Sequence, residues 1–400
     1  RRRLTAGQPE AEAHALMKAV TFLTLAGCLA AGMALGLLAG LKLHLARKGG
    51  SLGKLMLLNL AVLPVMAGCG FLADLFGVQP VLIGGASLLC LALLGVSAGG
   101  RSAKTGLAVL VAGLGTCALL VGTLLMVPRG LLGQQETAAS LNFGLVFIAL
   151  GALLVPVLLG TLTAAVGYRP AVVFFALAAL APALLAAFVP PEEFPQPGRP
   201  DAIALAGEPS LWLAGLVFAL YAPLEAFVSV WVTSYLKHHD AAEAAPRWLA
   251  SFWVSLTMSR VLFGLLQHAT ALGSAAYPST QVALLVVPAA LAAIVLGNLA
   301  GTAHFRNASG GLVMLGFFLG PVLPMLLAIV FGMEATAHAP ATALGAFFGC
   351  GAVGSLALAG LVGWSAQEKH IRGALRLPLF IALALAFASL FFGLIARWKP

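Results

Sequence analysis

Twelve apolar runs of about 20 residues cover most of this chain, and they constrain its fold more than any other feature. They span about 20–44, 54–76, 80–99, 105–127, 139–163, 170–189, 211–235, 248–268, 281–300, 310–332, 341–364 and 376–396. Runs of this length match what an α-helix needs to cross a hydrocarbon core. A transmembrane β-barrel would instead show alternating segments of about ten residues. The sequence therefore predicts an all-α integral membrane protein with twelve transmembrane helices.

The composition agrees with lipid as the main solvent of the chain. Of the 400 residues, 61% are hydrophobic and only 9% are charged, whereas about 25% of the residues in a soluble domain are charged. The net charge of +9 is spread over short loops and helix ends, so we expect a lipid bilayer as partner and no nucleic acid. The five cysteines lie within apolar runs without CxxC or CxxH spacing, and we interpret them as core residues.

A segment rich in proline and acidic residues, PPEEFPQPGRPDAIALAGEPS, separates the first six runs from the last six. Proline cannot continue a helix, so this segment is predicted to be a linker. The predicted organisation is an N-terminal cytoplasmic segment (1–18), an N-terminal six-helix half (19–189), a cytoplasmic linker (190–210) and a C-terminal six-helix half (211–397). Segments 147–160 and 347–360 match at five of fourteen positions, which supports two related halves. Many secondary transporters have this layout.

Glu225 is the only carboxylate that lies deep inside an apolar run, in ALYAPLEAFVSVW. An ionised side chain at the centre of a bilayer costs about 2.5 kcal/mol or more. Tyr221 and Ser229 lie four residues before and after it, so the three side chains share one helical face. We expect this face to line the bundle interior, where Glu225 would carry a proton or accept a hydrogen bond from a substrate. The alternative is a structural hydrogen bond between two helices.

Two tryptophans and one arginine are further candidates. Trp231 and Trp253 could stack on a sugar ring, although they fit an interfacial aromatic belt equally well. Arg260 lies within the eighth run, where it could pair with Asp240 or Glu334, cap a helix end or bind an anionic substrate. We favour a structural role for Arg260 in a gate.

Prolines inside the apolar runs predict kinked helices. They are Pro156, Pro223, Pro321 and Pro324. Proline removes one backbone hydrogen bond and frees the carbonyl one turn earlier. Kinked or broken helices often line transporter sites, although a passive kink is the alternative for each proline.

The second run ends with the sequence GFLADLFG. Gly70 would let two helices approach closely and Gly77 permits a tight turn, while Asp74 could meet a helix N-terminus or a cation. The spacing resembles the loop signature of the major facilitator superfamily, in which a glycine, an aspartate and a glycine are followed by basic residues. Here Val78 and Gln79 occupy the basic positions. An ordinary interfacial aspartate in a turn is the alternative.

More of the chain is similar to the fucose-permease-like branch of sugar:proton symporters within that superfamily. The residues that carry this likeness include Asn142, Gly151 and Pro156 in the fifth run, Tyr221, Glu225 and Trp231 in the seventh, Trp253, Arg260 and Gly264 in the eighth, and Gly320, Pro321 and Pro324 in the tenth. The resemblance implies two pseudo-symmetric halves, rocker-switch transport and a substrate-lining role for Asn142. Symporters of that branch use acidic residues in the first and fourth helices. Here 20–40 and 106–127 contain none, which leaves Glu225 as the candidate for proton coupling.

The resemblance also implies a multi-pass protein of the plasma (inner) membrane with both termini in the cytoplasm. This orientation places nine of the 22 lysines and arginines on the inner side and 13 outside. That distribution is opposite to the usual excess of positive charge on the cytoplasmic side. The orientation therefore rests on the motifs and not on the charges.

These features together predict a monomeric secondary transporter that moves a small polar organic solute, with a sugar as the leading candidate. Efflux of amphipathic or drug-like compounds is one alternative, and a non-transporting membrane receptor or scaffold is another. The sequence has no Walker loop, nucleophile elbow or HExxH motif, and its histidines lack the spacing of a metal site. We therefore expect no enzyme activity, no metal and no cofactor.

Overall fold

The computed structural model describes residues 8–47, 62–98, 102–198, 200–238, 244–270, 272, 278–301, 305–365 and 376–396. Over these residues the chain is helical and contains no strand. The main helices are α1 (Gln8–Arg47), α3 (Val62–Phe76), α4 (Val78–Ala98), α5 (Ser102–Gly130), α6 (Thr137–Val166), α7 (Tyr168–Ala178), α8 (Ala181–Phe188), α10 (Pro209–His238), α11 (Ala245–Thr270), α12 (Pro278–Gly301), α13 (Phe305–Leu319), α14 (Val322–Gly332), α15 (Pro340–Ser365) and α16 (Arg376–Ala396). Shorter elements are η1 (Gln134–Glu136), η2 (Pro191–Glu193), α9 (Ala202–Ala206) and η4 (Glu334–Thr336).

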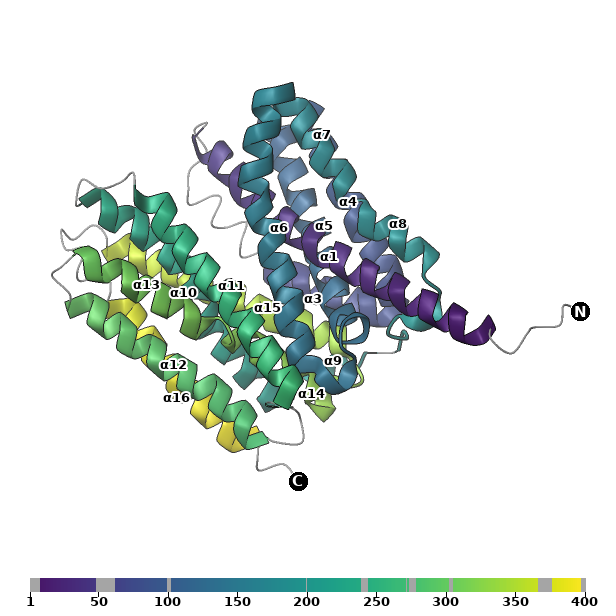
Figure 1. Cartoon of the computed structure of the whole chain (residues 1–400). Coiled ribbons are helices and arrows are strands. Elements are labelled where there is room, and N and C mark those ends of the chain that lie inside the picture. Colours follow the sequence, from purple (N-terminus) through teal and green to yellow (C-terminus); the bar gives the residue numbers. More distant parts are fainter. Residues whose placement is uncertain are drawn as a thin grey trace, which may run out of the picture.

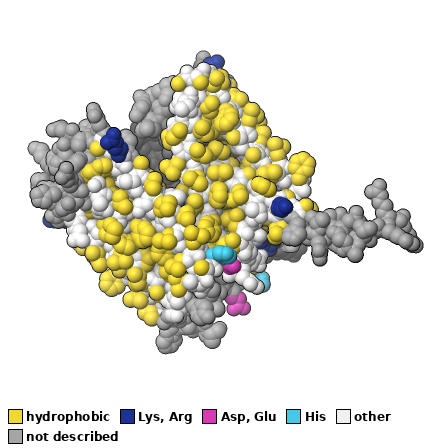
Figure 2. Space-filling view, viewed as in Figure 1, with side chains coloured by type: hydrophobic (Ala, Val, Ile, Leu, Met, Phe, Trp, Pro, Cys, Tyr) yellow, Lys and Arg dark blue, Asp and Glu magenta, His cyan; other side chains and the backbone are white. Residues whose placement is uncertain are grey.

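Eleven helical stretches among the described residues are long and apolar enough to cross a membrane, and α3 is a shorter apolar helix. The first residues of the second predicted run, 54–61, lie outside the described residues. Figure 2 shows hydrophobic side chains over the middle of the visible face, with charged side chains toward its edges. The prediction of an all-α membrane protein is therefore confirmed.

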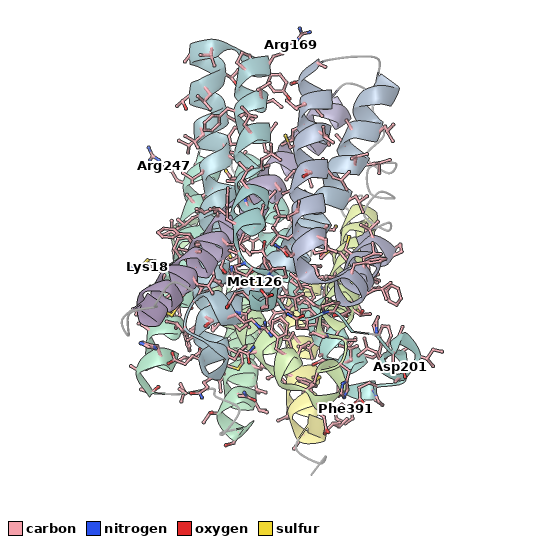
Figure 3. All side chains as sticks on the ribbon, turned by 90° about the vertical axis from the view of Figure 1, so that its right-hand side faces the viewer. Lys18, Met126, Arg169, Asp201, Arg247 and Phe391 are labelled. Carbon is pink, nitrogen blue, oxygen red and sulfur yellow. The ribbon has the colours of Figure 1, made fainter. Side chains whose placement is uncertain are left out.

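The helices form two groups that lie side by side (Figure 1). The N-terminal group, coloured purple to teal, contacts the C-terminal group, coloured green to yellow, near the segment that contains η2 and α9. We refer to this end of the bundle as the linker end. Toward the opposite end the two groups diverge (Figure 1). Figure 3 shows Asp201 toward the linker end and Arg169 at the opposite end.

Two of the predicted runs are broken helices. The tenth run divides into α13 and α14 on either side of Gly320 and Pro321, as its prolines predicted. The sixth run divides into α7 and α8, which the sequence reading missed. Pro182 explains this second break, because its ring clashes with the carbonyl of Ala178, where α7 ends.

The linker is fixed to the end of the bundle. Phe194 and Leu205 are buried, and the backbone N–H of Gly198 donates to the carbonyl of Asp74 at 2.8 Å. Asp201 caps α9 by accepting from the backbone N–H of Ala204 at 2.9 Å. The linker therefore packs on the same helix end that carries the GFLADLFG sequence.

The internal repeat marks the same packing contact in both halves. The fifth helix of each half packs on the first, as α6 on α1 and α15 on α10. A Cβ atom on Gly151 would lie 2.2 Å from the carbonyl oxygen of Leu29, and one on Gly351 would lie 2.1 Å from the ring of Phe218. Both matched glycines therefore allow equivalent helix pairs of the two halves to pack closely.

Candidate functional site

Hydrogen bonds join the two halves at two helix contacts, and both lie toward the linker end. The first, which we name the α3/α15 seam, consists of Met66, Gly70 and Asp74 against Ala341, Thr342 and Gly345. A Cβ on Gly70 would lie 2.1 Å from the carbonyl oxygen of Ala341, and a Cβ on Gly345 would lie 2.3 Å from that of Met66. Each helix thus contributes a glycine where the other backbone approaches, as predicted for Gly70.

Asp74 closes the α3/α15 seam with three hydrogen bonds. Its carboxylate accepts from the backbone N–H of Ala341 at 3.0 Å, from the N–H of Thr342 at 2.7 Å and from the Thr342 hydroxyl at 2.7 Å. These N–H groups belong to the first turn of α15, which has no earlier carbonyls to bind them. The buried carboxylate also lies at the positive end of the helix dipole. The predicted contact of Asp74 with a helix N-terminus is therefore present.

The turn after Asp74 also follows the prediction. Gly77 has a φ of +98°, a left-handed conformation that favours glycine. Gln79, at one of the positions where the superfamily carries basic residues, donates to the carbonyls of Ala186 at 2.8 Å and Val189 at 3.1 Å. Its amide thus supplies donors to one carbonyl in the last turn of α8 and to that of the residue that follows the helix, a task that basic residues often perform.

The second contact, which we name the α6/α11 seam, consists of Glu136, Asn142 and Phe143 against Gly264, Gln267 and His268. Asn142 donates to Oε1 of Gln267 at 2.8 Å, and both side chains are buried. Nearer the solvent, His268 pairs with Glu136. Asn142 thus lies in this seam, and its substrate-lining role stays a prediction.

The seams are equivalent in the repeated architecture, because each packs the second helix of one half on the fifth helix of the other. The hydrogen bonds and the ion pair of these two seams lie toward the linker end. The first helices of the two halves, α1 and α10, do not form a packed pair over the described residues. The structure is therefore closed at the linker end.

Glu225 lies near the middle of α10 in a cluster with Tyr221 and Arg260. One guanidinium nitrogen of Arg260 is 3.1 Å from Oε1 of Glu225, and the hydroxyl of Tyr221 is 2.5 Å from the same oxygen. Tyr221 and Arg260 are buried, whereas the side chain of Glu225 keeps 20% of its surface exposed. The structure therefore pairs Arg260 with Glu225, and not with Glu334 at the linker end; Asp240 lies outside the described residues.

The broken helix α13/α14 completes this cluster through its free carbonyls. Pro321 and Pro324 have no N–H, so they leave the carbonyls of Phe317 and Gly320 without their helical partners. Ser259 donates to the carbonyl of Phe317 at 2.6 Å, and Nε of Arg260 donates to that of Gly320 at 3.1 Å. Two adjacent residues of α11 thus satisfy both of the carbonyls that the prolines free.

The hydroxyl of Tyr221 connects the broken helix to Glu225. It lies 3.0 Å from the carbonyl oxygen of Leu319 as well as 2.5 Å from Glu225. A tyrosine hydroxyl has one proton to donate and can also accept. With Glu225 ionised, the two acceptors share that proton. With Glu225 protonated, the acid could donate to Tyr221 while Tyr221 donates to Leu319, so the geometry accommodates both forms.

The other predicted residues are placed apart from this cluster or outside the described side chains. Trp253 is partly buried, with an edge-to-face ring contact to Phe252 at 5.2 Å. The side chains of Ser229 and Trp231 lie outside the described residues. Helices α6 and α10 continue through Pro156 and Pro223 without a break.

Sequence reasoning missed several polar residues that hold the site together. Ser259 and Gln267 both lie in the eighth run, on helix α11, as does Arg260. The signal was available for Ser259, because a helix with two prolines three residues apart needs two outside donors. No comparable signal identifies Gln267, whose partner is 125 residues away.

Comparison with known proteins gives a likeness in structure alone. No protein-family model matches the chain, and no curated protein sequence matches it. The proton:xylose symporter XylE of the major facilitator superfamily has a similar structure, with a TM-score of 0.74 at 13% identity over 97% of this chain and 96% of that one. The E. coli fucose:proton symporter FucP aligns with a TM-score of 0.71 at 16% identity, over 93% of this chain and 98% of that one.

A human protein is also similar. The organic anion transporter MFSD10 aligns with a TM-score of 0.70 at 16% identity, over 93% of this chain and 99% of that one. These alignments cover nearly the whole length of each chain, including both six-helix halves. This chain therefore has the fold of the major facilitator superfamily transporters.

Proposed function

We propose that this protein is a secondary transporter that carries a small polar organic solute through the bundle by rocker-switch alternating access. The observation that carries the proposal is that the halves, about 19–189 and 211–397, join through two glycine-lined seams toward the linker end and diverge toward the other end. Alternating access requires such a contact to open as a unit. The solute would bind between the halves, at the level of Glu225.

We assign proton coupling to Glu225, with Tyr221 and Arg260 as its partners. The first and fourth helices carry no acidic residue over 20–40 and 106–127, so they cannot provide a second carboxylate. A proton bound to Glu225 could be passed into the hydrogen bond with Tyr221, whose own proton would then point to Leu319. Protonation would also weaken the hold of Glu225 on Arg260, which gives a solute the opportunity to take over that contact.

A sugar remains the leading substrate class. Glu225, Arg260 and the hydroxyl of Tyr221 supply both donors and acceptors at one place, which suits a solute with many hydroxyl groups. Ser229, Trp231 and Trp253 remain candidates to line the same path. The symporters with a similar fold are named for xylose and fucose.

One observation favours efflux of amphipathic compounds as a second candidate function. Phe218 stacks on Phe347 with ring centroids 4.4 Å apart and meets Phe348 edge-to-face at 5.3 Å. Phe218 also stacks on Tyr221. An aromatic surface next to an ion pair would suit a ligand with one apolar and one polar face.

The proposed orientation places the linker end and both termini in the cytoplasm of a cell with an inner membrane. In that orientation the structure is closed to the cytoplasm and represents the outward-facing state of a monomer. The charge distribution does not favour this orientation, so protease access to the linker in sealed vesicles is the direct test of it.

The function is tested with the full chain in proteoliposomes, with and without an inward proton gradient. The panel should contain hexoses, pentoses, organic anions and amphipathic dyes. We expect uptake of at least one polar solute, and at least a tenfold loss of its proton-driven accumulation in Glu225→Gln.

Glu334→Gln is the matched control, because Glu334 is an exposed acid in η4, just before α15. It should transport like the unchanged protein. If no compound on the panel moves under any gradient, the transport proposal is wrong, and a receptor or scaffold role replaces it. If Glu225→Gln keeps the full proton dependence, the coupling assignment alone is wrong.

A further inference from the structure

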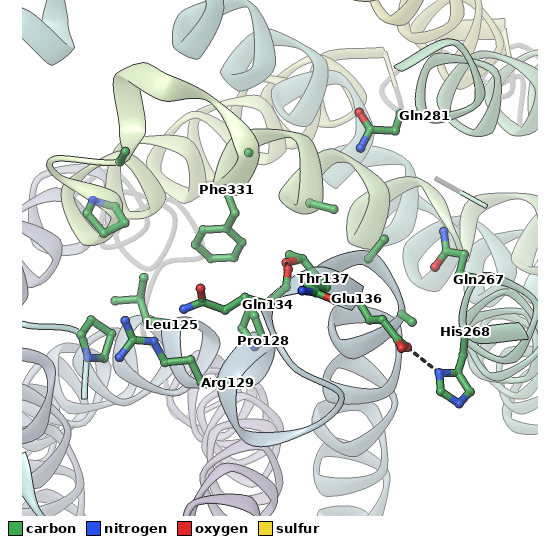
Figure 4. Close-up of a pocket in the computed structure, with 18 of the residues that line it drawn as sticks. Leu125, Pro128, Arg129, Gln134, Glu136, Thr137, Gln267, His268, Gln281 and Phe331 are labelled. Carbon is green, nitrogen blue, oxygen red and sulfur yellow. Dashed lines mark hydrogen bonds and ion pairs between the residues drawn. The ribbon is translucent and has the colours of Figure 1, made fainter. Parts of the chain in front are cut away.

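A pocket of about 460 Å³ opens at the linker end, below the two seams. Both halves line it. Arg129 and Gln134 come from the end of α5 and the following η1, and Gln267, Gln281 and Phe331 come from α11, α12 and α14. Figure 4 shows Arg129, Gln134 and Phe331 on one side of the pocket and the Glu136–His268 pair on the other. A cavity of this size can hold a small organic molecule.

The charges of the pocket favour an anion. Glu136, the acidic residue in its lining, is engaged by His268. The guanidinium of Arg129 contacts only the backbone carbonyl of Glu193, at 3.4 Å, and forms no ion pair with any described residue. A guanidinium binds carboxylates with two parallel hydrogen bonds. Arg129 is therefore the available anchor for a carboxylate.

The remaining polar groups favour an anion that also bears hydroxyl groups. Side-chain amides line the pocket from Gln134, Gln135, Gln267 and Gln281. A side-chain amide carries both donors and an acceptor, the two kinds of group that a hydroxyl can bind. Because Oε1 of Gln267 accepts from Asn142, Gln267 offers its NH₂ group to a ligand. Phe331 adds an apolar wall for the carbon skeleton.

We propose that this pocket binds a small hydroxylated organic anion. While the anion is bound, it stabilises the closed state of the linker end. A ligand in a pocket that both halves line loses one set of contacts when the halves separate. It therefore binds the closed state better than the open one and shifts the equilibrium toward closure. This site is distinct from the Glu225 cluster, although its effect on transport rests on the proposed function.

The test measures citrate binding to the purified full chain in nanodiscs, by calorimetry and by thermal shift. Citrate has three carboxylates and one hydroxyl, and tricarballylate is the same acid without the hydroxyl. We expect citrate to raise the unfolding temperature, Arg129→Gln to weaken binding at least tenfold, and tricarballylate to bind several-fold more weakly than citrate. Arg247→Gln, an exposed arginine of α11 distant from the pocket (Figure 3), is the matched control and should bind like the unchanged protein.

Equal citrate binding by Arg129→Gln and the unchanged protein would overturn the proposal, as would equal loss in Arg247→Gln. If Arg129→Gln does not fold, Gln134→Ala on the exposed η1 replaces it, with a several-fold loss expected. In proteoliposomes, citrate on the linker side should slow transport, and citrate on the other side should not. A chain that binds citrate but transports nothing would refute the transport function and leave the site intact, whereas a chain that transports but ignores citrate would refute only the site.

Discussion

The α3/α15 seam and the α6/α11 seam occupy equivalent places in the repeated architecture, yet different chemistry closes them. In the α3/α15 seam, the buried carboxylate of Asp74 accepts hydrogen bonds from backbone N–H groups at the N-terminus of α15. At the equivalent place in the other seam, His268 is about half exposed and pairs with the side chain of Glu136, which is 37% exposed. The comparison shows that one seam depends on fixed backbone groups, whereas the other depends on one hydrogen bond between the side chains of Asn142 and Gln267 and on a solvent-screened pair.

The largest effect is expected when the buried charge is removed. Asp74→Ala leaves two backbone N–H groups and the Thr342 hydroxyl without partners, and each buried unsatisfied group costs about 1–3 kcal/mol. We expect the linker end to open and hydrogen exchange to rise at residues 340–345. Asp201→Ala, which removes an exposed cap from α9, is the control and should change exchange only in the linker. Unchanged exchange in Asp74→Ala would mean that Asp74 does not hold the seam.

A smaller effect is expected from adding one methyl group to each seam. In Gly70→Ala the new Cβ would lie 2.1 Å from a backbone oxygen, so the two helices must separate. In Gly264→Ala the nearest atoms are the Cβ of Asn142 and the ring of Phe143, both at 3.2 Å, so a shift of a few tenths of an ångström is enough to fit the new methyl group. We expect transport to fall about tenfold in Gly70→Ala and less than twofold in Gly264→Ala.

Gly68→Ala is the matched control for this pair. Gly68 lies on the same helix as Gly70, α3, and a Cβ atom there would meet no atom within 4 Å. It should behave like the unchanged protein in the same uptake assay. An equal loss of transport in Gly70→Ala and Gly264→Ala would show that the two seams are equally tight, and would contradict the closer helix approach inferred for the α3/α15 seam.

The smallest effect is expected at the exposed pair. His268→Gln and Glu136→Gln each remove a contact between side chains that are 52% and 37% exposed, and such pairs contribute about 0–1 kcal/mol. We expect less than a threefold change in transport, and the change should vanish at high salt. A loss as large as that in Asp74→Ala would show that the α6/α11 seam is the stronger one.

The sequence allowed most of the fold to be predicted, because span length and proline position act locally. The apolar runs located the helices, Pro321 and Pro324 located the break in the tenth run, and Gly77 located the turn. The break at Pro182 was equally local and was missed because ALAPALL reads as an uninterrupted apolar run. Local rules thus account for nearly all of the helix pattern.

The site could be predicted only in part, because its contacts depend on how separate helices are rotated against one another. The shared face of Tyr221 and Glu225 follows from their spacing on one helix. The pairing of Glu225 with Arg260 joins residues 35 apart on two helices, and no spacing rule indicates it. The role of Asn142 is a similar case, since its neighbour Gln267 belongs to the other half.

The ion pair of Glu225 and Arg260 has an electrical consequence. The two charges cancel near the middle of α10, so the cluster is neutral overall when both groups are ionised. A proton on Glu225 would leave one net positive charge at that depth. A unit charge that crosses the whole membrane changes its energy by about 2.3 kcal/mol per 100 mV. The forms with Glu225 protonated and with Glu225 ionised would therefore respond differently to the membrane potential. Transport of an uncharged solute would then still be driven by voltage.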